Sequence, residues 1–268
     1  MNLPLIYWDS VQRGVEFFEH FTKYLEMIRN FNKRLYYHLG KIKAKEDPLV
    51  FCEGGFDGGT LGLEDSIAPV LKASTISFGY GGLNELQLLH NGKSLYEDGE
   101  FAKKVLTFMA DKINYYKEED HILHAIYGTP GESWLTTACK QFKTMYGDVK
   151  GICSRGYFTN SFHNHVSEDI TPIEKMESEL RFWPYPIGGR IMYCKIPITY
   201  NVKAIKDIVR KAMSHGLYYG VNHAEDHCED CGGHFIGDDT IEDSICPYCN
   251  SINILQIRRM NGLRIKSL

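Results

Sequence analysis

Apolar residues along this 268-residue chain follow two periodicities. The opening MNLPLIYW is a short apolar run and predicts a strand. Runs rich in β-branched and aromatic residues predict further strands at Ser74–Tyr80, His121–Tyr127 and Arg190–Pro197. Apolar positions at helical spacing predict helices at Val11–Lys45, Leu83–His90, Tyr96–Tyr116 and Asn201–Ser214. Strands that alternate with helices indicate an α/β fold with parallel strand pairing.

Composition narrows the class of protein. With 43% hydrophobic residues the chain can bury a sizeable core, as one large domain with an appendage. The formal net charge of -4 reflects no basic excess, so no nucleic-acid partner is expected. No run approaches the roughly 20 apolar residues that cross a bilayer, and the first residues lack the pattern of a signal peptide. Together with scattered, unpaired cysteines, these features predict a protein of the reducing cytoplasm.

Four cysteines near the C-terminus form two C-x-x-C pairs, Cys228 with Cys231 and Cys246 with Cys249. Two such pairs in one short segment make the ligand set of a tetrahedral zinc site. Neighbouring glycine and proline residues favour the tight turns that both pairs need. A site closed by four protein thiolates would hold a structural ion rather than a catalytic one. A disulfide pair or chance spacing is the alternative.

A second group of candidate residues lies at Thr129–Ser133 (TPGES), where a predicted strand passes into a helix. Thr129 suits the N-cap, Pro130 suits the first helical position, and Glu132 would complete a capping box with Thr129. Helix capping alone explains these residues. The same free N–H groups and helix dipole would also bind an anion, because ligands of α/β folds bind at the carboxyl edge of the sheet. Gly131 would let the phosphates of a nucleoside triphosphate approach the backbone closely.

Several segments in collinear order carry a resemblance to one family. They are YGTPGES at Tyr127–Ser133, RGYFTNSFHNHVSEDITPIEK at Arg155–Lys175, PYPIGGRI at Pro184–Ile191, GLYYGVNHAEDHCEDCG at Gly216–Gly232, CPYCNS at Cys246–Ser251 and RRMNG at Arg258–Gly262. With these segments the chain resembles the C-terminal half of the anaerobic (class III) ribonucleoside-triphosphate reductases, which are oxygen-sensitive glycyl radical enzymes.

The resemblance implies a fold and a set of site residues. Residues 1–221 would form the second half of a ten-stranded α/β barrel, and residues 222–268 a zinc-ribbon glycyl radical module. Gly262 falls on the position of the radical glycine, although by local sequence alone it reads as an ordinary turn glycine. The zinc positions fall on Cys228, Cys231, Cys246 and Cys249. The substrate phosphates would lie against Tyr127, Thr129, Pro130, Gly131, Glu132 and Ser133.

The resemblance also implies the chemistry. A separate activase, which uses S-adenosylmethionine and a four-iron–four-sulfur cluster, would remove a Cα hydrogen from Gly262. The glycyl radical would then convert a cysteine into a thiyl radical that takes the 3′-hydrogen of a ribonucleoside triphosphate. Glycine suits this role because the unpaired electron is delocalised over the flanking amide groups and planarity is easier without a side chain. The protein would position the reactants and exclude oxygen and water, within a homodimeric assembly.

The chain departs from the family pattern at both ends. The matching segments begin after the regulatory cone, the first half-barrel and the loop with the thiyl cysteine. None of Cys52, Cys139, Cys153 and Cys194 matches that cysteine. After Gly262, Leu263 replaces the usual aromatic residue and only a short tail follows. Because a half-barrel would expose strand edges and an apolar face, we expect the N-terminal half on a partner chain, with an inactive fragment as the alternative.

Two other functions stay open on the sequence. A noncatalytic zinc-ribbon scaffold or binding protein is one, but the residues around the cysteines are acidic, which disfavours nucleic acid. A glycyl radical enzyme with another substrate is the second, and the zinc ribbon together with TPGES argues against it. We expect no chemistry from His163, His165 and His223, and we expect Cys139 and Cys194 to be small buried residues.

Overall fold

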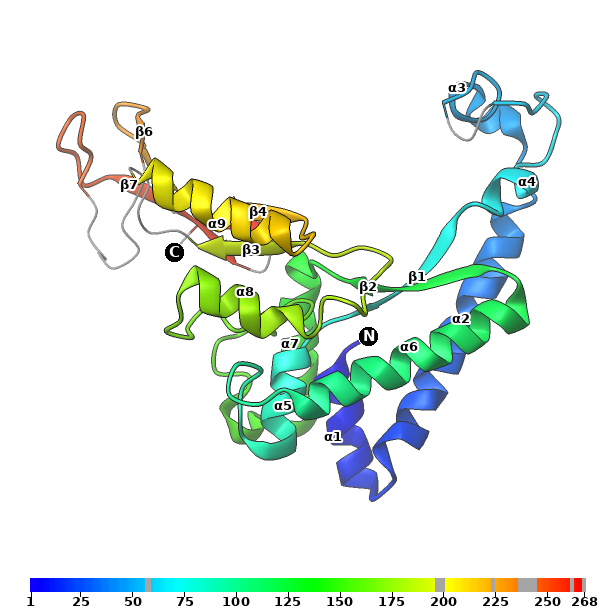
Figure 1. The fold of residues 1–268 in the computed structure, drawn as a ribbon, viewed down its shortest axis with the longest axis horizontal. Coiled ribbons are helices and arrows are strands. Elements are labelled where there is room, and N and C mark those ends of the chain that lie inside the picture. The colour runs from blue at the N-terminus through cyan, green and yellow to red at the C-terminus, as the bar shows by residue number, and fades with distance from the viewer. Residues whose placement is uncertain (56–58, 196–200, 223–224, 236–244, 261–262, 267–268) are drawn as a thin grey trace.

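The computed structural model describes residues 1–55, 59–195, 201–222, 225–235, 245–260 and 263–266 (Figure 1). Its helices are α1 (Leu3–Arg13), α2 (Phe17–Leu39), α3 (Pro48–Phe51), α4 (Ala68–Leu71), α5 (Leu83–Asn91), α6 (Glu100–Asp120), α7 (Glu132–Tyr146), α8 (Pro172–Leu180) and α9 (Val202–Ser214), with short 3-10 turns at Ala44–Glu46 and Val149–Gly151. Its strands are β1 (Thr75–Tyr80), β2 (Leu123–Gly128), β3 (Met192–Lys195), β4 (Tyr219–Asn222), β5 (Glu225–Cys228), β6 (His234–Phe235), β7 (Ile254–Met260) and β8 (Leu263–Lys266).

The described strands form two parallel pairs and one antiparallel sheet. β1 pairs with β2, from Thr75 opposite Leu123 to Tyr80 opposite Gly128, and β3 pairs with β4. The antiparallel sheet has the order β6-β5-β7-β8. Helices α5 and α6 connect β1 to β2, and α9 connects β3 to β4, as crossovers between parallel strands require. The predicted α/β class with parallel pairing is therefore confirmed.

The largest apolar core lies between the β1–β2 pair and the helices around it. Phe78 and Tyr80 of β1 are fully buried, and they belong to one cluster with Leu3 of α1, Phe21 of α2 and Leu106 of α6. In Figure 1 the α3–α4 region and strands β6 and β7 lie at opposite ends of the molecule. None of the helices in the described ranges has the length and apolar character of a membrane span.

The N-terminal run is a helix, so the strand predicted at MNLPLIYW is wrong. Asn2 caps α1, because its side chain accepts a hydrogen bond from the Leu5 N–H at 3.3 Å. Pro4 lies in the first turn, where a backbone N–H would have no helical partner. Gly14 ends the helix with a φ of 63°, a left-handed conformation that glycine adopts without strain. The single long helix predicted over Val11–Lys45 is therefore two helices, α1 and α2.

Helix α8 was not predicted, although its signal is present in the sequence. The Thr171 hydroxyl accepts from the Glu174 N–H at 3.2 Å, and the Glu174 carboxylate accepts from the Thr171 N–H at 2.7 Å. This reciprocal pair is a capping box, and Pro172 occupies the first helical position. The other predicted helices and strands are present with shifted ends, except that residues 196–197, the end of the strand predicted at Arg190–Pro197, lie outside the described residues.

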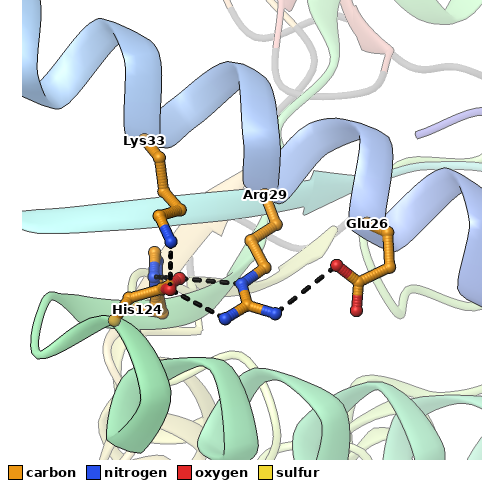
Figure 2. Close-up of polar contacts among 5 residues, drawn as sticks. Glu26, Arg29, Lys33 and His124 are labelled. Carbon is orange, nitrogen blue, oxygen red and sulfur yellow. Dashed lines mark hydrogen bonds and ion pairs between the residues drawn. The ribbon is translucent and has the colours of Figure 1, made fainter.

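A buried cluster of charged side chains joins α2 to the connection between α6 and β2. Figure 2 shows the polar contacts among these side chains. The carboxylate of Asp120 accepts hydrogen bonds from Arg29 at 2.8 and 2.7 Å and from Lys33 at 2.6 Å. His124 of β2 lies 3.2 Å from the same carboxylate, and Arg29 also lies 3.4 Å from Glu26. The Asp120 side chain is 1% exposed, so these contacts replace its hydration.

Candidate metal centre and strand-end site

The two C-x-x-C segments fold into matching turns. The Gly232 N–H donates to the Cys228 carbonyl, and the Asn250 N–H donates to the Cys246 carbonyl, both at 2.9 Å. Gly232 and Asn250 are both left-handed, with φ of 72° and 60°. The first cysteine of each pair also donates its N–H to the carbonyl five residues further on, at 2.9 and 2.8 Å. Because glycine and asparagine tolerate this conformation best, the local sequence specifies both turns.

These turns bring the four thiols together. The Sγ atoms of Cys228, Cys231, Cys246 and Cys249 all lie within 4.8 Å of one another. The Cys228–Cys249 and Cys231–Cys246 separations are both 3.6 Å. Four sulfurs at a usual Zn–S distance of about 2.3 Å, at the corners of a tetrahedron, would lie about 3.8 Å apart, so the spacing fits zinc. Hydrogen bonding from the Cys231 backbone N–H outweighs desolvation and lowers the pKa of Cys228 to about 7, which favours the thiolate that a metal binds.

Polar side chains join the two turns to each other. Asp230, in the first turn, accepts from the Ser251 hydroxyl at 2.5 Å and from the Asn253 amide at 2.9 Å. Tyr248, in the second turn, donates from its hydroxyl to the His234 carbonyl at 3.1 Å. The cysteine positions are therefore held from both sides by contacts that do not involve sulfur.

Gly262, the expected radical residue, lies outside the described residues, as does His223. The described strands β7 and β8 pair antiparallel, with Met260 opposite Leu263. β7 also pairs with β5, which ends at Cys228. The cysteine cluster and the strand that leads toward Gly262 therefore share one sheet.

The junction between β2 and α7 forms where it was predicted, but with a different cap. The N-cap of α7 is Gly131, with a φ of 80° and no side-chain hydrogen bond. The capping box expected between Thr129 and Glu132 is therefore wrong, and Pro130 precedes the helix. The Thr129 hydroxyl donates instead to the Tyr127 carbonyl at 3.4 Å. Since the N-cap offers no side-chain acceptor, the first N–H groups of α7 are left for water or an anion.

The predicted phosphate-binding residues gather at the carboxyl end of β2, on the edge that it shares with β1. Thr129 is half-buried, whereas Ser133 is exposed in the first turn of α7. A Cβ on Gly131 would collide with Leu135, and a Cβ on Gly79 would collide with Thr129. The two glycines thus permit a close approach of backbone and side chains at this edge.

A buried polar loop, residues Thr159–His165, covers the same edge. The Thr159 carbonyl accepts from the Gly82 N–H at 2.8 Å, and Asn160 forms a bridge with Gly81 beyond the end of β1. Ser161 lies against Gly128 of β2, where a Cβ would collide with its hydroxyl. Ser161 also has a φ of 49°, an uncommon conformation for a residue other than glycine. Strained residues of this kind cluster at functional sites.

Two buried glutamates hold the polar loop. Glu85 of α5 accepts from the Thr159 N–H at 3.0 Å and from the Thr159 hydroxyl at 2.7 Å. Glu179 of α8 lies 3.0 Å from His163 Nδ1 and accepts from the Asn164 N–H at 2.8 Å. The sequence alone predicts that the histidines of this loop are internal residues without chemistry. The signal that was available is the dense polar run NSFHNH.

Comparison with solved structures identifies the class of fold. A structure titled anaerobic ribonucleotide reductase from Thermotoga maritima with MES in the active site matches with a TM-score of 0.66 and 18% identity, over 98% of this chain and 42% of that chain. Another, titled anaerobic ribonucleotide reductase, matches with a TM-score of 0.65 and 16% identity, over 98% of this chain and 39% of that chain. The chain therefore has the α/β fold of these reductases.

Comparison of sequences identifies the family. The family model for anaerobic ribonucleoside-triphosphate reductase matches residues 1–264, so the chain belongs to this reductase family. The anaerobic ribonucleoside-triphosphate reductase of Escherichia coli (strain K12) is 29% identical over 260 residues, which are 94% of this chain and 36% of the relative. That of Enterobacteria phage T4 is 31% identical over 277 residues, 98% of this chain and 43% of the relative. The chain thus spans well under half the length of these relatives.

Proposed function

We propose that this chain contributes the radical glycine, a structural zinc site and the substrate-phosphate site to an anaerobic ribonucleoside-triphosphate reductase. The observation that carries the proposal is the family match over residues 1–264, because it includes Gly262, the four cysteines and TPGES. The reaction converts ribonucleoside triphosphates to deoxyribonucleoside triphosphates, and its place is the reducing cytoplasm.

The four cysteines are the zinc ligands in this proposal. Support comes from the all-thiol donor set, the separations of 3.6 Å and the two matching turns. With four protein ligands the ion has no open position, so it serves to hold the two turns together. Residues 222–268 then form the zinc-ribbon glycyl radical module, and residues 1–221 the barrel half with the phosphate site.

Gly262 is the residue that stores the unpaired electron. Loss of one Cα hydrogen leaves a radical that is delocalised over the two flanking amide groups. The supporting observation is that β7, which precedes Gly262, pairs with β5, which carries Cys228. The zinc site would therefore restrain the strand that leads to the radical position. The partner that makes the radical is an activase that uses S-adenosylmethionine and an iron–sulfur cluster.

The substrate phosphates bind to Tyr127 and Thr129–Ser133 in this proposal. The supporting features are the uncapped start of α7, the left-handed Gly131 and the position at the carboxyl edge of β1 and β2. Free N–H groups at a helix start attract phosphate oxygens, and the helix dipole adds to that attraction.

The remaining parts of the reductase are partners in the proposal. The chain spans 36% and 43% of the two curated relatives. We assign the thiyl cysteine, the regulatory cone and the other half of a ten-stranded barrel to the N-terminal half of the reductase on a partner chain. The complete enzyme would be a homodimer of such pairs.

The radical assignment is tested by electron paramagnetic resonance. The zinc-loaded chain, with the N-terminal half of a reductase of this family, is incubated without oxygen with the activase, S-adenosylmethionine and a reductant. We expect a doublet signal, because the electron couples to the hydrogen that stays on the Gly262 Cα. Admission of air should then cut the chain at Gly262, and mass spectrometry would locate the cut.

Two variants make the test specific. Gly262→Ala should remove both the doublet and the cut. Gly40→Ala is the control, because Gly40 has an ordinary helical φ of -58° and an added Cβ would meet Ala68 at 3.4 Å, an ordinary contact. Absence of a doublet from the unsubstituted chain, or a signal that survives Gly262→Ala, would remove the radical role from Gly262.

A further inference from the structure

Two cysteines outside the metal centre, Cys139 of α7 and Cys153, lie against each other. Cys153 Sγ lies 3.8 Å from the carbonyl oxygen of Cys139, and the two thiol groups also interact with each other. Cys194, another buried cysteine, contacts the Pro172 carbonyl at 3.4 Å instead. A disulfide forms only between cysteines whose backbones are close together. A sulfur that contacts the backbone of its partner residue meets this condition.

The fold holds both thiols in place before any bond joins them. Cys139 lies within α7, and the Cys153 N–H donates to the Asp148 carboxylate at 2.7 Å. Both cysteines belong to one apolar cluster, together with Leu135 and Phe142 of α7. Because packing and hydrogen bonds fix both residues, little further ordering is needed for the two sulfur atoms to meet.

The two thiols differ in how they can reach solvent. Cys139 is 1% exposed and Cys153 is 2% exposed. Cys153, however, lies in a surface turn, because Gly151 before it and Ser154 after it are exposed. In the same turn Lys150 has a φ of 50°, a strained conformation for a residue other than glycine. A local opening of this turn would therefore expose Cys153 while α7 stays folded.

Burial protects both thiols while the turn is closed. It is the largest influence on each group, and it raises the pKa of Cys153 to about 12 and also raises the pKa of Cys139. The thiolate is the form that reacts with disulfides, so the closed turn reacts slowly at neutral pH. Opening restores contact with water and lets the pKa fall toward the ordinary value of about 8.5. The rate of oxidation therefore depends on how often the turn opens.

We propose that Cys139 and Cys153 are a redox-sensitive pair that forms a reversible disulfide, with a small disulfide such as oxidised glutathione as the oxidant. The Cys153 thiolate attacks one glutathione sulfur and displaces a glutathione thiolate. The Cys139 thiolate then attacks the Cys153 sulfur and displaces the second glutathione. The two protons that the cysteines lose go to the two glutathione thiolates. Two protein thiols are thereby oxidised to one disulfide, and one glutathione disulfide is reduced to two thiols.

The disulfide would join α7 to the turn that leads into the polar loop. Past Cys153 the chain returns along α7, where the Phe158 N–H contacts the Leu135 carbonyl at 3.4 Å. A bond between Cys139 and Cys153 closes a short loop and restricts the unfolded chain, so the oxidised form is the more stable one. Disulfides of a reducing compartment are commonly transient and redox-sensing. This inference does not depend on the proposed function.

Peptide mapping of the zinc-loaded full chain tests the proposal. The chain is incubated with oxidised glutathione at about pH 8, near the ordinary pKa of a thiol, and the remaining thiols are then alkylated. We expect mass spectrometry to find Cys139 linked to Cys153, and the chain to lose two of its eight thiol groups while its zinc content stays constant. The urea midpoint of unfolding should rise on oxidation, and dithiothreitol should return it to the starting value.

Three variants make the test specific. Cys153→Ser and Cys139→Ser should each abolish the cross-link and the shift in the urea midpoint. Cys194→Ser is the matched control, because it removes a buried cysteine that contacts a carbonyl, and it should keep both.

The unsubstituted chain alone can overturn the proposal. Oxidation confined to the four thiols of the metal centre would do so, as would glutathione that stays attached to Cys153 without a cross-link. A cross-link that forms only in the fully unfolded chain would show that the fold does not prepare the pair. A cross-link without a change in the urea midpoint would show that the bond does not stabilise the chain.

Discussion

Asp120→Asn removes the carboxylate that joins α2 to the end of α6 and to β2. In the native chain this carboxylate accepts hydrogen bonds from Arg29 at 2.8 and 2.7 Å and from Lys33 at 2.6 Å. The side chains of Asp120 and Arg29 are 1% and 13% exposed, so water cannot replace the lost partner of Arg29. The Lys33 side chain is 32% exposed and can turn toward solvent. The substitution therefore leaves one buried guanidinium without its main counter-charge.

The size of the effect follows from this geometry. Removal of one partner from a buried ion pair destabilises a protein by about 3–5 kcal/mol. Asparagine keeps the volume and one acceptor oxygen, and Glu26, 3.4 Å from Arg29, retains part of the attraction. Both features reduce the loss, so we expect a fall of about 3 kcal/mol in the free energy of unfolding, at the lower end of that range.

Urea unfolding of the zinc-loaded chain, followed by circular dichroism, measures this loss. Asp207→Asn is the control, because the Arg210–Asp207 pair has side chains that are 72% and 57% exposed and should contribute nothing measurable. Arg29→Met combined with Asp120→Asn should cost less than the two single changes together, because no unpaired charge stays buried. A loss below about 1 kcal/mol for Asp120→Asn, or additive single changes, would refute the reasoning.

The same carboxylate makes a pH-dependent contribution. The Arg29 guanidinium, with help from Lys33 and His124 and against desolvation, holds the pKa of Asp120 far below its usual range. A carboxyl group with a lowered folded-state pKa stabilises the fold at pH values above its unfolded pKa, which is about 3.9. That contribution fades as the pH falls below this value toward the folded pKa. The stability difference between the native chain and Asp120→Asn should therefore be constant at neutral pH and shrink below about pH 4.

Two further predictions concern the cysteine cluster and helix capping. Cys246→Ser removes one of the four thiols, so bound zinc should fall on titration with a chromogenic chelator, and proteases should cut residues 225–266 before residues 1–195. Retention of zinc and of protease resistance would contradict the metal assignment. Thr171→Ala breaks the capping box of α8 and should lower the free energy of unfolding by about 1 kcal/mol, whereas Thr129→Ala, which caps nothing, should change it little. Equal losses in urea unfolding would show that Thr129 does cap α7.

The α/β class could be predicted from the sequence because β1 and β2 are β-branched and aromatic runs that alternate with helical spacing. The N-terminal helix could not be predicted in the same way, since a short apolar run such as MNLPLIYW fits a strand and a buried helix equally well. The information lies at the ends of the helix, where Asn2 caps it and Gly14 terminates it. End signals of this kind decide between two structures that hydrophobicity alone cannot separate.

The candidate sites differ in how far their contacts extend along the chain. The cysteine turns could be predicted because their hydrogen bonds join residues four or five positions apart. The polar loop could not, because its anchors are distant: Glu85 is 74 residues from Thr159, and Glu179 is 16 residues from His163. Nothing in the sequence near either glutamate indicates that its carboxylate will be buried against a loop at the carboxyl edge of β1 and β2.

The two helix starts with the pattern Thr-Pro-x-Glu show why one cap formed and the other did not. At Thr171 the third residue is Ile173, whose branched side chain disfavours a left-handed backbone, and the capping box closes. At Thr129 the third residue is Gly131, which adopts a φ of 80° and becomes the N-cap itself. A single glycine therefore prevents the cap that the pattern predicts. The first N–H groups of α7 have no side-chain acceptor at the N-cap. At TPGES the glycine prevents the cap that the sequence could have supplied, so this helix start is better suited to bind an anion than to stabilise the helix. This difference supports a phosphate site at TPGES and not at TPIE.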